Sequence, residues 1–236
     1  MNAIFDPQGY FDKIFCISVA SRVDRQETAK EAFAELGILD RVEFVLVQKH
    51  PTNPEEGIFN SHLHCLSRGL EEGGQHILIF EDDIAVDHFS ARCMVEAVKA
   101  LEQQNWDSFF LGAIRSKSSK TDSGFLERIE YRCLTHGYAL NRPFAQKIIS
   151  EKWNGVAYDG VLKKLCRNSF APVPMIAFQN TSESDNKTIF LDKVRRFFGG
   201  LQFLQRSNEL LHRYMFPIVL AHLLVLVSVV LVLLRT

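Results

Sequence analysis

The chain has 236 residues, of which 47% are apolar and 23% are charged, and its formal net charge is -1 at pH 7. This length suits one α/β domain with a substantial core and an additional segment. Charge is uneven: residues 193–236 hold six Lys/Arg and one acid, which leaves 21 basic and 27 acidic residues in 1–192. The five cysteines are widely spaced without a Cys-x-x-Cys pair, which argues against a disulfide framework and a structural zinc site.

Strand and helix patterns alternate in the first half of the chain. Residues 11–19 and 42–47 have the pattern of strands, and Asp24 and Glu27 have capping-box spacing ahead of a helix over 25–36. The next expected elements are a polar loop over 48–57, a helix over 60–72, a strand over 77–83, a helix over 89–103 and a strand over 107–111. This alternation predicts a sheet covered by helices on both faces.

The pattern changes after residue 115. Residues 116–124 are expected to form a polar, flexible loop, and 128–140 a hairpin. Pro143 then opens a helix that reaches about residue 152, a further helix spans 158–166, and 171–178 is extended around two prolines. No internal repeat or low-complexity run divides the chain, so we expect one α/β domain followed by a tail.

The apolar run over 77–80 leads directly into Glu81, Asp82 and Asp83. The carboxyl end of such a strand is where open α/β sheets place ligands. Side chains alternate along an extended chain, so we expect Glu81 and Asp83 on one face and Asp82 on the other. Two carboxylates on one face favour Mg²⁺ or Mn²⁺, which fill their remaining positions with water and phosphate oxygens. The alternative is a solvated acidic turn without function.

The tail contains 19 uncharged residues, 216–234. A helix of that length measures about 28 Å, close to the hydrocarbon thickness of a bilayer, so we expect a transmembrane helix over 215–235, with a buried core helix as the alternative. Basic residues precede it and only Arg235 follows it, which predicts a single-pass protein whose body lies in the cytoplasm. The chain start also lacks a secretory signal pattern. Residues 191–214 mix basic and apolar side chains, as in a juxtamembrane segment that lies on an anionic leaflet or packs on the domain.

Spaced sequence pieces together resemble glycosyltransferase family 25, which includes bacterial lipooligosaccharide galactosyltransferases and collagen galactosyltransferases. In the family's order they are 15–19 with Asp24 and Arg25, then 57–63, 79–83, 106–107, 111–112, 135–140, 158–159, and 172–174 followed by Gln179 and Ser182. They span most of residues 11–185. Two positions depart from the family pattern, because Ser18 stands where Asn is common and Gly137 follows His136 where Ala is usual.

The resemblance implies a GT-A-like glycosyltransferase with a Rossmann-type nucleotide-sugar-binding sheet in residues 1–190. It implies metal binding by Asp83 and Asp82. The implied donor-binding residues are Glu81, Asp82, Ser18, Arg25 and His62, and the implied acceptor-binding residues are His136 and Gln179. Structural roles are the alternative for both histidines. Asp159, near a helix start, is the first candidate for the general base of an inverting transfer, and its alternative is a helix cap.

The implied reaction moves a hexose, most commonly galactose from UDP-galactose, to a glycan or lipid-linked acceptor at the membrane, as in lipopolysaccharide biosynthesis. Its cofactor would be Mn²⁺ or Mg²⁺, and we expect no nucleic-acid partner. The alternative is a catalytically inactive, tail-anchored binding module, which the intact acidic triplet disfavours. A P-loop phosphotransferase is also disfavoured, because the chain has no Gly-x-x-x-x-Gly-Lys loop.

Overall fold

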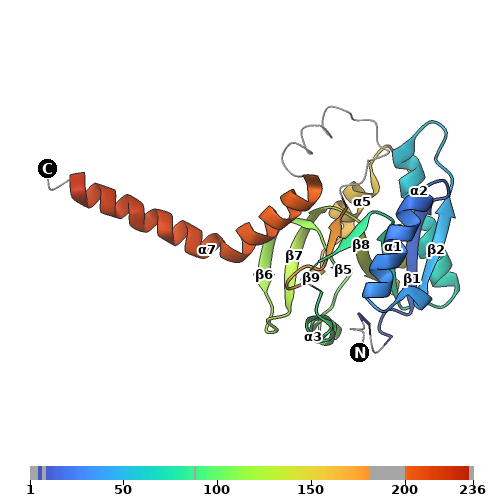
Figure 1. Ribbon diagram of the computed structural model, residues 1–236, viewed down its shortest axis with the longest axis horizontal. Coiled ribbons are helices and arrows are strands. Elements are labelled where there is room, and N and C mark those ends of the chain that lie inside the picture. Colours follow the sequence, from blue (N-terminus) through green and yellow to red (C-terminus); the bar gives the residue numbers. More distant parts are fainter. Residues whose placement is uncertain (1–4, 7–8, 88, 181–199, 234–236) are drawn as a thin grey trace.

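The computed structural model describes residues 5–6, 9–87, 89–180 and 200–233. Among these residues, a mixed eight-stranded sheet has the order β2-β1-β3-β8-β5-β9-β7-β6, and β10 pairs with β4 in a small second sheet (Figure 1). The strands are β1 (Lys13–Val19), β2 (Val42–Val47), β3 (His76–Glu81), β4 (Ile84–Val86), β5 (Ser108–Phe110), β6 (Ile114–Lys120), β7 (Leu126–Cys133), β8 (Gly137–Asn141), β9 (Ser169–Pro172) and β10 (Ala177–Gln179). The helices are α1 (Val23–Glu35), the 3-10 helix η1 (Leu39–Arg41), α2 (Pro54–Glu71), α3 (Ala91–Glu102), α4 (Arg142–Ile149), α5 (Tyr158–Leu165) and α7 (Gly200–Leu233).

The first half of the sheet is Rossmann-like. Strands β2, β1 and β3 are parallel neighbours, and α1 and α2 make the connections between them. The carboxyl ends of β1 and β3 therefore meet at one edge of the sheet, where an open α/β fold places its ligands. The α/β fold expected from the sequence is confirmed in this half.

Two helix starts differ from the sequence expectation. Helix α2 begins at Pro54 rather than near residue 60, because the Asn53 side chain accepts a hydrogen bond from Glu56 N (3.4 Å) and proline suits the first helical position. The capping box at Asp24 does not form. Helix α1 has Arg22 at its N-cap without a side-chain cap bond, and Asp24 pairs with Arg22 at 2.8 Å instead.

The second half of the sheet corrects two expectations. Most of the expected loop over 116–124 lies in β6, which pairs antiparallel with β7. The expected hairpin over 128–140 does not form, since β7 pairs with β6 and β9 while β8 lies between β3 and β5. Strand β6 is one of the two edge strands of the sheet, and its polar side chains are typical of that position.

Apolar side chains cover both faces of the central sheet. Strand β3 shows this directly: Leu78 and Phe80 belong to one buried cluster, with residues of α1 and α3, while Ile77 and Ile79 belong to another, with residues of α2, α4 and α5. A strand buried on both faces has an unbroken apolar sequence. The buried strand therefore holds the acidic triplet at a fixed place on the sheet edge.

Helix α7 has a docked part, Gly200–Met215, and a projecting part that begins at Pro217. The docked part packs on β6 and β10, where the buried Gln205 side chain donates to Ala177 O at 2.8 Å. The Asn208 side chain accepts from Arg115 N at 3.1 Å and donates to Arg115 O at 2.9 Å. Of the two alternatives for residues 191–214, packing on the domain thus describes the portion from Gly200 onward, and residues 191–199 lie outside the described residues.

Beyond the docked part, α7 runs away from the body and contains Pro217 (Figure 1). Among the described residues, no single helix is both long and apolar enough to cross a membrane. Gly200–Met215 and Pro217–Leu226, which meet at 64°, satisfy those criteria only as a bent pair. The transmembrane helix over 215–235 therefore stays a prediction.

Candidate active site

The acidic triplet lies where β3 ends. Glu81 is the last residue of the strand, and Asp82 and Asp83 form a turn into β4. The turn is attached to its neighbours through the backbone, since Asp82 N donates to Ile17 O at 3.1 Å and Asn180 N donates to Asp83 O at 2.6 Å. Because the chain turns here, the strict alternation expected for three extended residues ends at Glu81. The two aspartates instead lie near a common cation.

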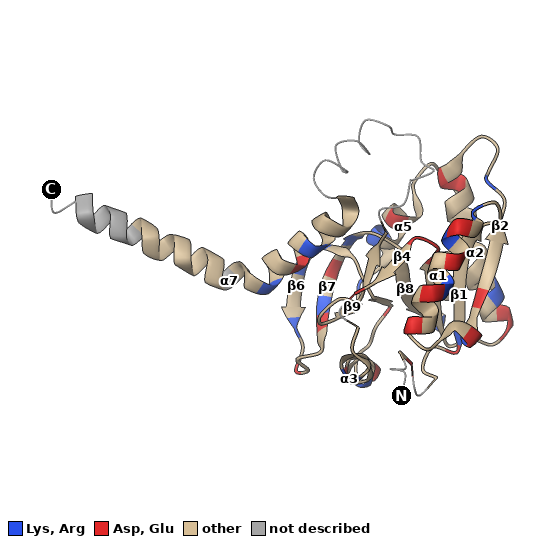
Figure 2. Ribbon diagram, in the orientation of Figure 1, with Lys and Arg blue, Asp and Glu red and all other residues tan. Residues whose placement is uncertain are grey.

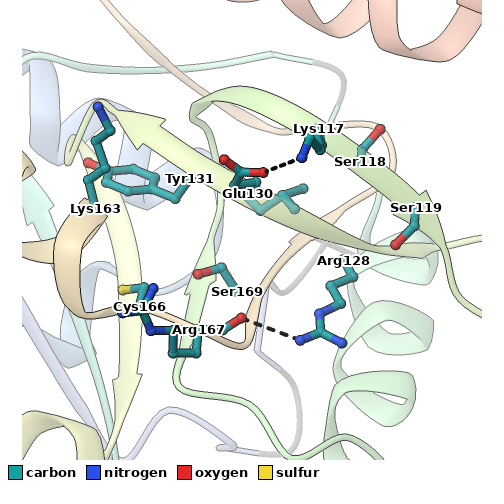
Figure 3. Close-up of a pocket in the computed structure, with 11 residues that line it drawn as sticks. Lys117, Ser118, Ser119, Arg128, Glu130, Tyr131, Lys163, Cys166, Arg167 and Ser169 are labelled. Carbon is teal, nitrogen blue, oxygen red and sulfur yellow. Dashed lines mark hydrogen bonds and ion pairs between the residues drawn. The ribbon is translucent and has the colours of Figure 1, made fainter.

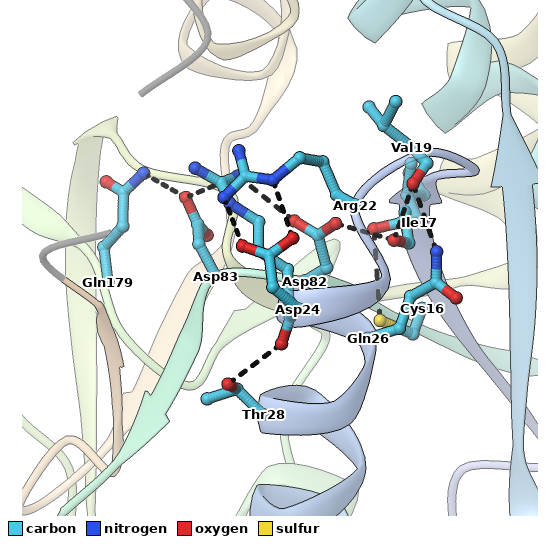
Figure 4. A network of polar contacts seen from close by, with 12 residues as sticks. Cys16, Ile17, Val19, Arg22, Asp24, Gln26, Thr28, Asp82, Asp83 and Gln179 are labelled. Atoms are coloured by element: carbon cyan, nitrogen blue, oxygen red, sulfur yellow. Dashed lines mark hydrogen bonds and ion pairs between the residues drawn. The ribbon is translucent and has the colours of Figure 1, made fainter. Parts of the chain in front are cut away.

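That cation is Arg25, from the first turn of α1. Its Nη1 atom lies 3.3 Å from Asp82 Oδ1 and 4.0 Å from Asp83 Oδ2. Ser18, at the end of β1, donates to the other Asp82 oxygen at 2.7 Å. Both aspartates are buried. Figure 4 shows the two carboxylates beside the start of α1, with Gln179 next to Asp83.

Asp83 has one satisfied oxygen and one unsatisfied oxygen. Gln179 Nε2, at the end of β10, donates to its Oδ2 atom at 2.6 Å. The Oδ1 atom is buried without a hydrogen-bond partner among the described residues. Burial, followed by the negative charge of Glu81, raises the pKa of Asp83 to about 7. A buried carboxylate oxygen without a donor is costly unless a proton or a cation occupies it.

Glu81 is oriented toward a second group of side chains. Thr135 Oγ1 donates to Glu81 Oε1 at 2.5 Å, and His62 Nε2 lies 3.5 Å from the same oxygen. Burial by itself would raise the pKa of Glu81. The hydrogen bond and charge of His62, with the hydrogen bond from Thr135, outweigh burial, so that this pKa is lowered. Glu81 is therefore a carboxylate that stays ionised beside the aspartates.

His62 is held in place by two tyrosines. Its ring stacks on Tyr158 with centroids 4.2 Å apart, and its Nδ1 atom lies 3.0 Å from Tyr138 Oη. Tyr138 Oη in turn donates to Tyr158 Oη at 2.9 Å, so the Nδ1–H of His62 is the donor to Tyr138. The Nε2 edge of the ring then faces Glu81. His62 positions Glu81, and its predicted contact with a donor remains a prediction.

Asp159 does not cap its helix. Helix α5 has Ala157 at its N-cap without a side-chain cap bond. Asp159 accepts from Tyr131 Oη at 2.7 Å and from Leu134 N at 3.3 Å. Leu134 has a φ of 83°, a strained conformation for a leucine that must be held by its surroundings. Asp159 thus stabilises the segment that carries Thr135.

The protonation of Asp159 is also set by its surroundings. Burial raises its pKa, the hydrogen bond from Tyr131 lowers it, and the negative charge of Glu81 raises it again, so that the net shift is upward. A carboxylate whose pKa is raised toward neutrality is suited to accept a proton. Two accepted hydrogen bonds leave further lone-pair sites on its oxygens.

His136 lies in the core beside this site. It is buried, and its Nε2–H donates to Ala177 O at 2.9 Å, the carbonyl that Gln205 also contacts. Burial lowers its pKa, so the ring is neutral. The contact also explains Gly112, at which an added Cβ would lie 1.8 Å from Ala177 O and 2.7 Å from His136 Nε2. This position accepts only glycine.

Two groups of predicted residues come together. One network contains Ser18, Arg25, Asp82, Asp83 and Gln179. The second group contains Glu81, His62 and Asp159. His136 bonds to β10, the strand that carries Gln179. The sequence alone indicates no role for Tyr131, Tyr138 or Thr135. The first two are apolar-patterned strand residues, and only the structure shows where their hydroxyls point. Thr135 was part of a resembling piece, without a function of its own.

The carboxylates suit a divalent cation that also binds substrate oxygens. Among the described residues, no three His, Cys, Asp or Glu side chains are grouped closely enough to hold a metal by themselves. Mg²⁺ and similar ions usually bind through one or two carboxylates plus water and substrate phosphates. When ionised, the triplet carries three negative charges against one positive charge on Arg25. Asp83 Oδ1 has no other partner among the described residues, so the site fits such an ion.

Comparison with known proteins gives a limited likeness. No family model matches the chain. Procollagen galactosyltransferase 1 of Danio rerio is 23% identical over 171 residues, which cover 59% of this chain and 28% of that protein. The chain therefore corresponds to little more than a quarter of that relative's length.

Solved structures show a partial likeness. A glycosyltransferase involved in the glycosylation of the major capsid of PBCV-1 has a TM-score of 0.45 at 12% identity, covering 65% of this chain and 74% of that one. UDP-glucose pyrophosphorylase complexed with UDP-glucose has a TM-score of 0.38 at 12% identity, covering 68% and 72%. Mannose-1-phosphate geranyltransferase from Thermus thermophilus has a TM-score of 0.42 at 11% identity, covering 68% and 73%.

Proposed function

We propose that the protein is a glycosyltransferase that moves a hexose, with galactose as the first choice, from a nucleotide-sugar donor to a glycan acceptor. The observation that carries this proposal is the buried Asp82–Asp83 turn at the carboxyl end of β3, with one carboxylate oxygen that has no partner among the described residues. The relative in Danio rerio, named a procollagen galactosyltransferase, supports the choice of sugar.

The donor would bind at this turn. Departure of a nucleoside diphosphate concentrates negative charge on phosphate oxygens, and Mn²⁺ or Mg²⁺ bound to Asp83 and Asp82 would neutralise it. Arg25 is the protein's own positive charge in the same place, and Ser18 fixes the orientation of Asp82. Gln179 fixes Asp83 in the same way. The donor contacts are thus arranged before the substrate arrives, which lowers the cost of binding and reaction.

Asp159 is the proposed general base. It would take the proton of the acceptor hydroxyl as that oxygen attacks the sugar carbon, in an inverting transfer. Its raised pKa and its place beside Glu81 support this role. Its hydrogen bonds from Tyr131 and Leu134 N hold the carboxylate in one orientation.

The test is release of nucleoside diphosphate from a panel of nucleotide sugars with Mn²⁺ present. The matched variants are Asp83→Asn, which should be inactive, and Asp40→Asn, an exposed carboxylate in η1 that should behave as wild type. Equal activity of the wild type and Asp83→Asn at limiting Mn²⁺ would exclude the proposed site. Tight binding of the nucleotide without turnover of any sugar would favour the inactive binding module instead.

We also propose that α7 attaches the protein to a membrane, with the body on the cytoplasmic side. Its projecting part exposes large apolar side chains, for example Leu223 at 52% and Val225 at 64%. In Figure 2 this projecting part is tan, without blue or red, up to the point where the grey begins, so that stretch holds no Lys, Arg, Asp or Glu. Exposed apolar surface of this extent is typical of a segment that contacts lipid or another protein. Retention of the protein in sealed membranes after a high-salt wash is the measurement that tests it.

A further inference from the structure

A groove lies between the β6–β7 edge and α5, outside the acidic site. Its volume is about 480 Å³. Four basic side chains line it and one acidic side chain does, together with the hydroxyls of Ser118, Ser119 and Ser169 (Figure 3); the basic residues are Lys117, Arg128, Lys163 and Arg167, and the acid is Glu130. The groove therefore carries a local excess of positive charge.

Most of this charge is not paired with an acidic side chain in the part of the chain that the structure describes. Among the described residues, the side chains of Lys163 and Arg167 have no hydrogen-bond or ion-pair partner. The partners of Arg128 in the described ranges are uncharged oxygens, Arg167 O at 3.4 Å and Asn168 Oδ1 at 2.7 Å. Within the described part of the chain, only Lys117 has an acidic partner, Glu130 at 3.4 Å, and both of those side chains are exposed. An exposed pair of that kind contributes little to stability. Missing partners alone do not indicate a site, because solvated cations on a flat surface would also remain unpaired. Here they line a concave surface.

The wall of the groove is rigid at two points. Asp107 Oδ2 accepts from Arg167 N and Asn168 N, both at 3.0 Å, which fixes the segment that carries Arg167. Tyr131 is buried on the groove wall, and its ring stacks on Phe110 with centroids 4.0 Å apart. The positive charges are therefore presented by a preorganised frame, which reduces the entropy cost of binding a ligand.

Tyr131 also connects the groove to the candidate base. Its ring lines the groove, and its hydroxyl donates to Asp159 Oδ1 at 2.7 Å. A ligand in the groove would lie on one side of Tyr131 while the carboxylate that accepts the proton lies at its hydroxyl end. An acceptor in the groove would therefore have to extend past the Tyr131 ring for its hydroxyl to reach Asp159, because a general base must lie within hydrogen-bond distance of the proton it takes.

We propose that this groove binds the acceptor and that the acceptor is an anionic sugar, carrying a phosphate or carboxylate group. Lys163 and Arg167 bind the anionic group, with Arg128 as the third cation. That the ligand is the acceptor rests on the proposed function, whereas recognition of an anionic sugar rests on the groove alone. The groove determines specificity by charge, because a neutral sugar leaves its cations without partners.

The test is calorimetric titration of the full-length protein, in a nonionic detergent, with glucose, glucose 6-phosphate and inorganic phosphate. Glucose 6-phosphate should bind at least about tenfold more tightly than either of the others, since charge-assisted hydrogen bonds and sugar contacts are combined. The double variant Lys163→Gln, Arg167→Gln should lose that advantage. The control is Lys164→Gln, an exposed lysine of the same helix that does not line the groove. It should bind as wild type does.

The outcomes separate the two proposals. Equal binding of glucose and glucose 6-phosphate by the wild type, or an equal loss in Lys164→Gln, would overturn the groove as a site. Equal binding of inorganic phosphate and glucose 6-phosphate would overturn recognition of a sugar. UDP binding with Mn²⁺ should be unchanged in all variants, which shows that the fold is intact. Failure of the wild type to bind any nucleoside diphosphate would instead count against the glycosyltransferase, whatever the groove binds.

Discussion

At the scale of single residues, Asp83 decides whether the acidic turn is a metal site. Replacement by Asn keeps the shape of the side chain and removes the charge that holds the cation. We expect Asp83→Asn to keep its fold and to lose Mn²⁺-dependent binding of nucleoside diphosphate. Asp82→Asn should also lose transfer, because Asp82 is the second proposed metal ligand and Ser18 and Arg25 hold it in the same network. Circular dichroism checks the fold, and titration with UDP and Mn²⁺ checks binding. Activity near wild type in both variants would contradict the assignment.

The pH dependence of metal binding follows from the same residue. Because the pKa of Asp83 is raised from 3.8 to about 7, the folded apo protein keeps a proton there that the unfolded chain has released. This group's contribution to stability is therefore present at low pH and declines as pH rises from about 4 to about 7. A cation must displace that proton, so Mn²⁺ affinity should fall as pH drops below about 7. Titrations at pH 6 and pH 8 measure it, and an affinity independent of pH would contradict it.

Asp159 and Tyr131 give a test of the base that is separate from the metal. Asp159→Asn should leave nucleotide binding unchanged and lower kcat at least about a hundredfold, the usual size of a general-base effect. The hydrogen bond from Tyr131 lowers the pKa of Asp159. Tyr131→Phe should therefore raise that pKa and move the acidic limb of the kcat profile to higher pH.

The two variants also distinguish a base from a structural aspartate. If Asp159→Asn weakens donor binding and spares turnover, Asp159 contacts the donor or only stabilises the Leu134 segment. If Tyr131→Phe lowers kcat equally at every pH, the hydroxyl has a structural role and the limb belongs to another group. The measurement in both cases is the pH profile of kcat with the donor at saturation.

At the scale of elements, β6 and β7 are joined by a buried ion pair. Arg115 Nη1 lies 2.5 Å from Glu127 Oε1, and the two side chains are 2% and 13% exposed. Burial lowers the pKa of Arg115 and raises that of Glu127, so desolvation opposes the pair. Removing Glu127 nevertheless leaves the buried Arg115 charge without its ion-pair partner. We expect Glu127→Ala to destabilise the protein by about 3 kcal/mol.

The companion variants locate the cause. Glu130→Ala, which removes the partner of an exposed lysine on the neighbouring strand, should leave the free energy of unfolding nearly unchanged, because exposed ion pairs contribute little. The double variant Arg115→Met, Glu127→Leu should recover most of the lost stability, because a well-packed apolar pair replaces the charges. Urea unfolding gives the three free energies. A double variant less stable than Glu127→Ala would show that the pair stabilises beyond its charge balance.

The elements also show what the sequence can and cannot predict. The β3 strand and its acidic end were predictable, because a strand buried on both faces has a continuous apolar run and ends where its polar residues begin. Strand β6 was not, since the outermost strand of a sheet exposes polar side chains much as a loop does. The place of β8 between β3 and β5 depends on pairing between distant segments, which local patterns do not contain.

The same limit applies to the site. The residues of the acidic turn could be found in the sequence because they follow a buried strand, at whose carboxyl end an open α/β sheet places its ligands. Arg25 was indicated by the family resemblance alone. Tyr131 could not, because a strand residue with an apolar ring gives no indication of which carboxylate its hydroxyl meets. The positive groove could not be found either, since Lys117 and Arg128 are far in the sequence from Lys163 and Arg167, and only the fold brings the two segments together.

At the scale of the whole molecule, α7 divides into a part that the domain needs and a part that it does not. A chain that ends at Met215 keeps the contacts of Gln205 and Asn208 with β10 and β6. A chain that ends at Lys187 loses them, and it uncovers Met175 N, to which Glu209 is hydrogen-bonded at 3.1 Å. We expect the first truncation to unfold at nearly the full-length temperature and the second to be clearly less stable. Equal stability of the two chains would show that the docked part contributes nothing.

The chain that ends at Met215 also isolates the role of the projecting part. It lacks the apolar, exposed segment and should be soluble without detergent, with unchanged transfer to a water-soluble acceptor, because the acidic turn and the groove lie entirely in the retained chain. Transfer to an acceptor embedded in vesicles should fall, since attachment raises the local concentration of enzyme at the surface without adding contacts in the site. The measurement is the ratio of the two rates for full-length and truncated protein. An unchanged ratio, or extraction of the full-length protein by high salt alone, would contradict attachment through α7. Digestion of the body by protease outside sealed cells would contradict the cytoplasmic orientation.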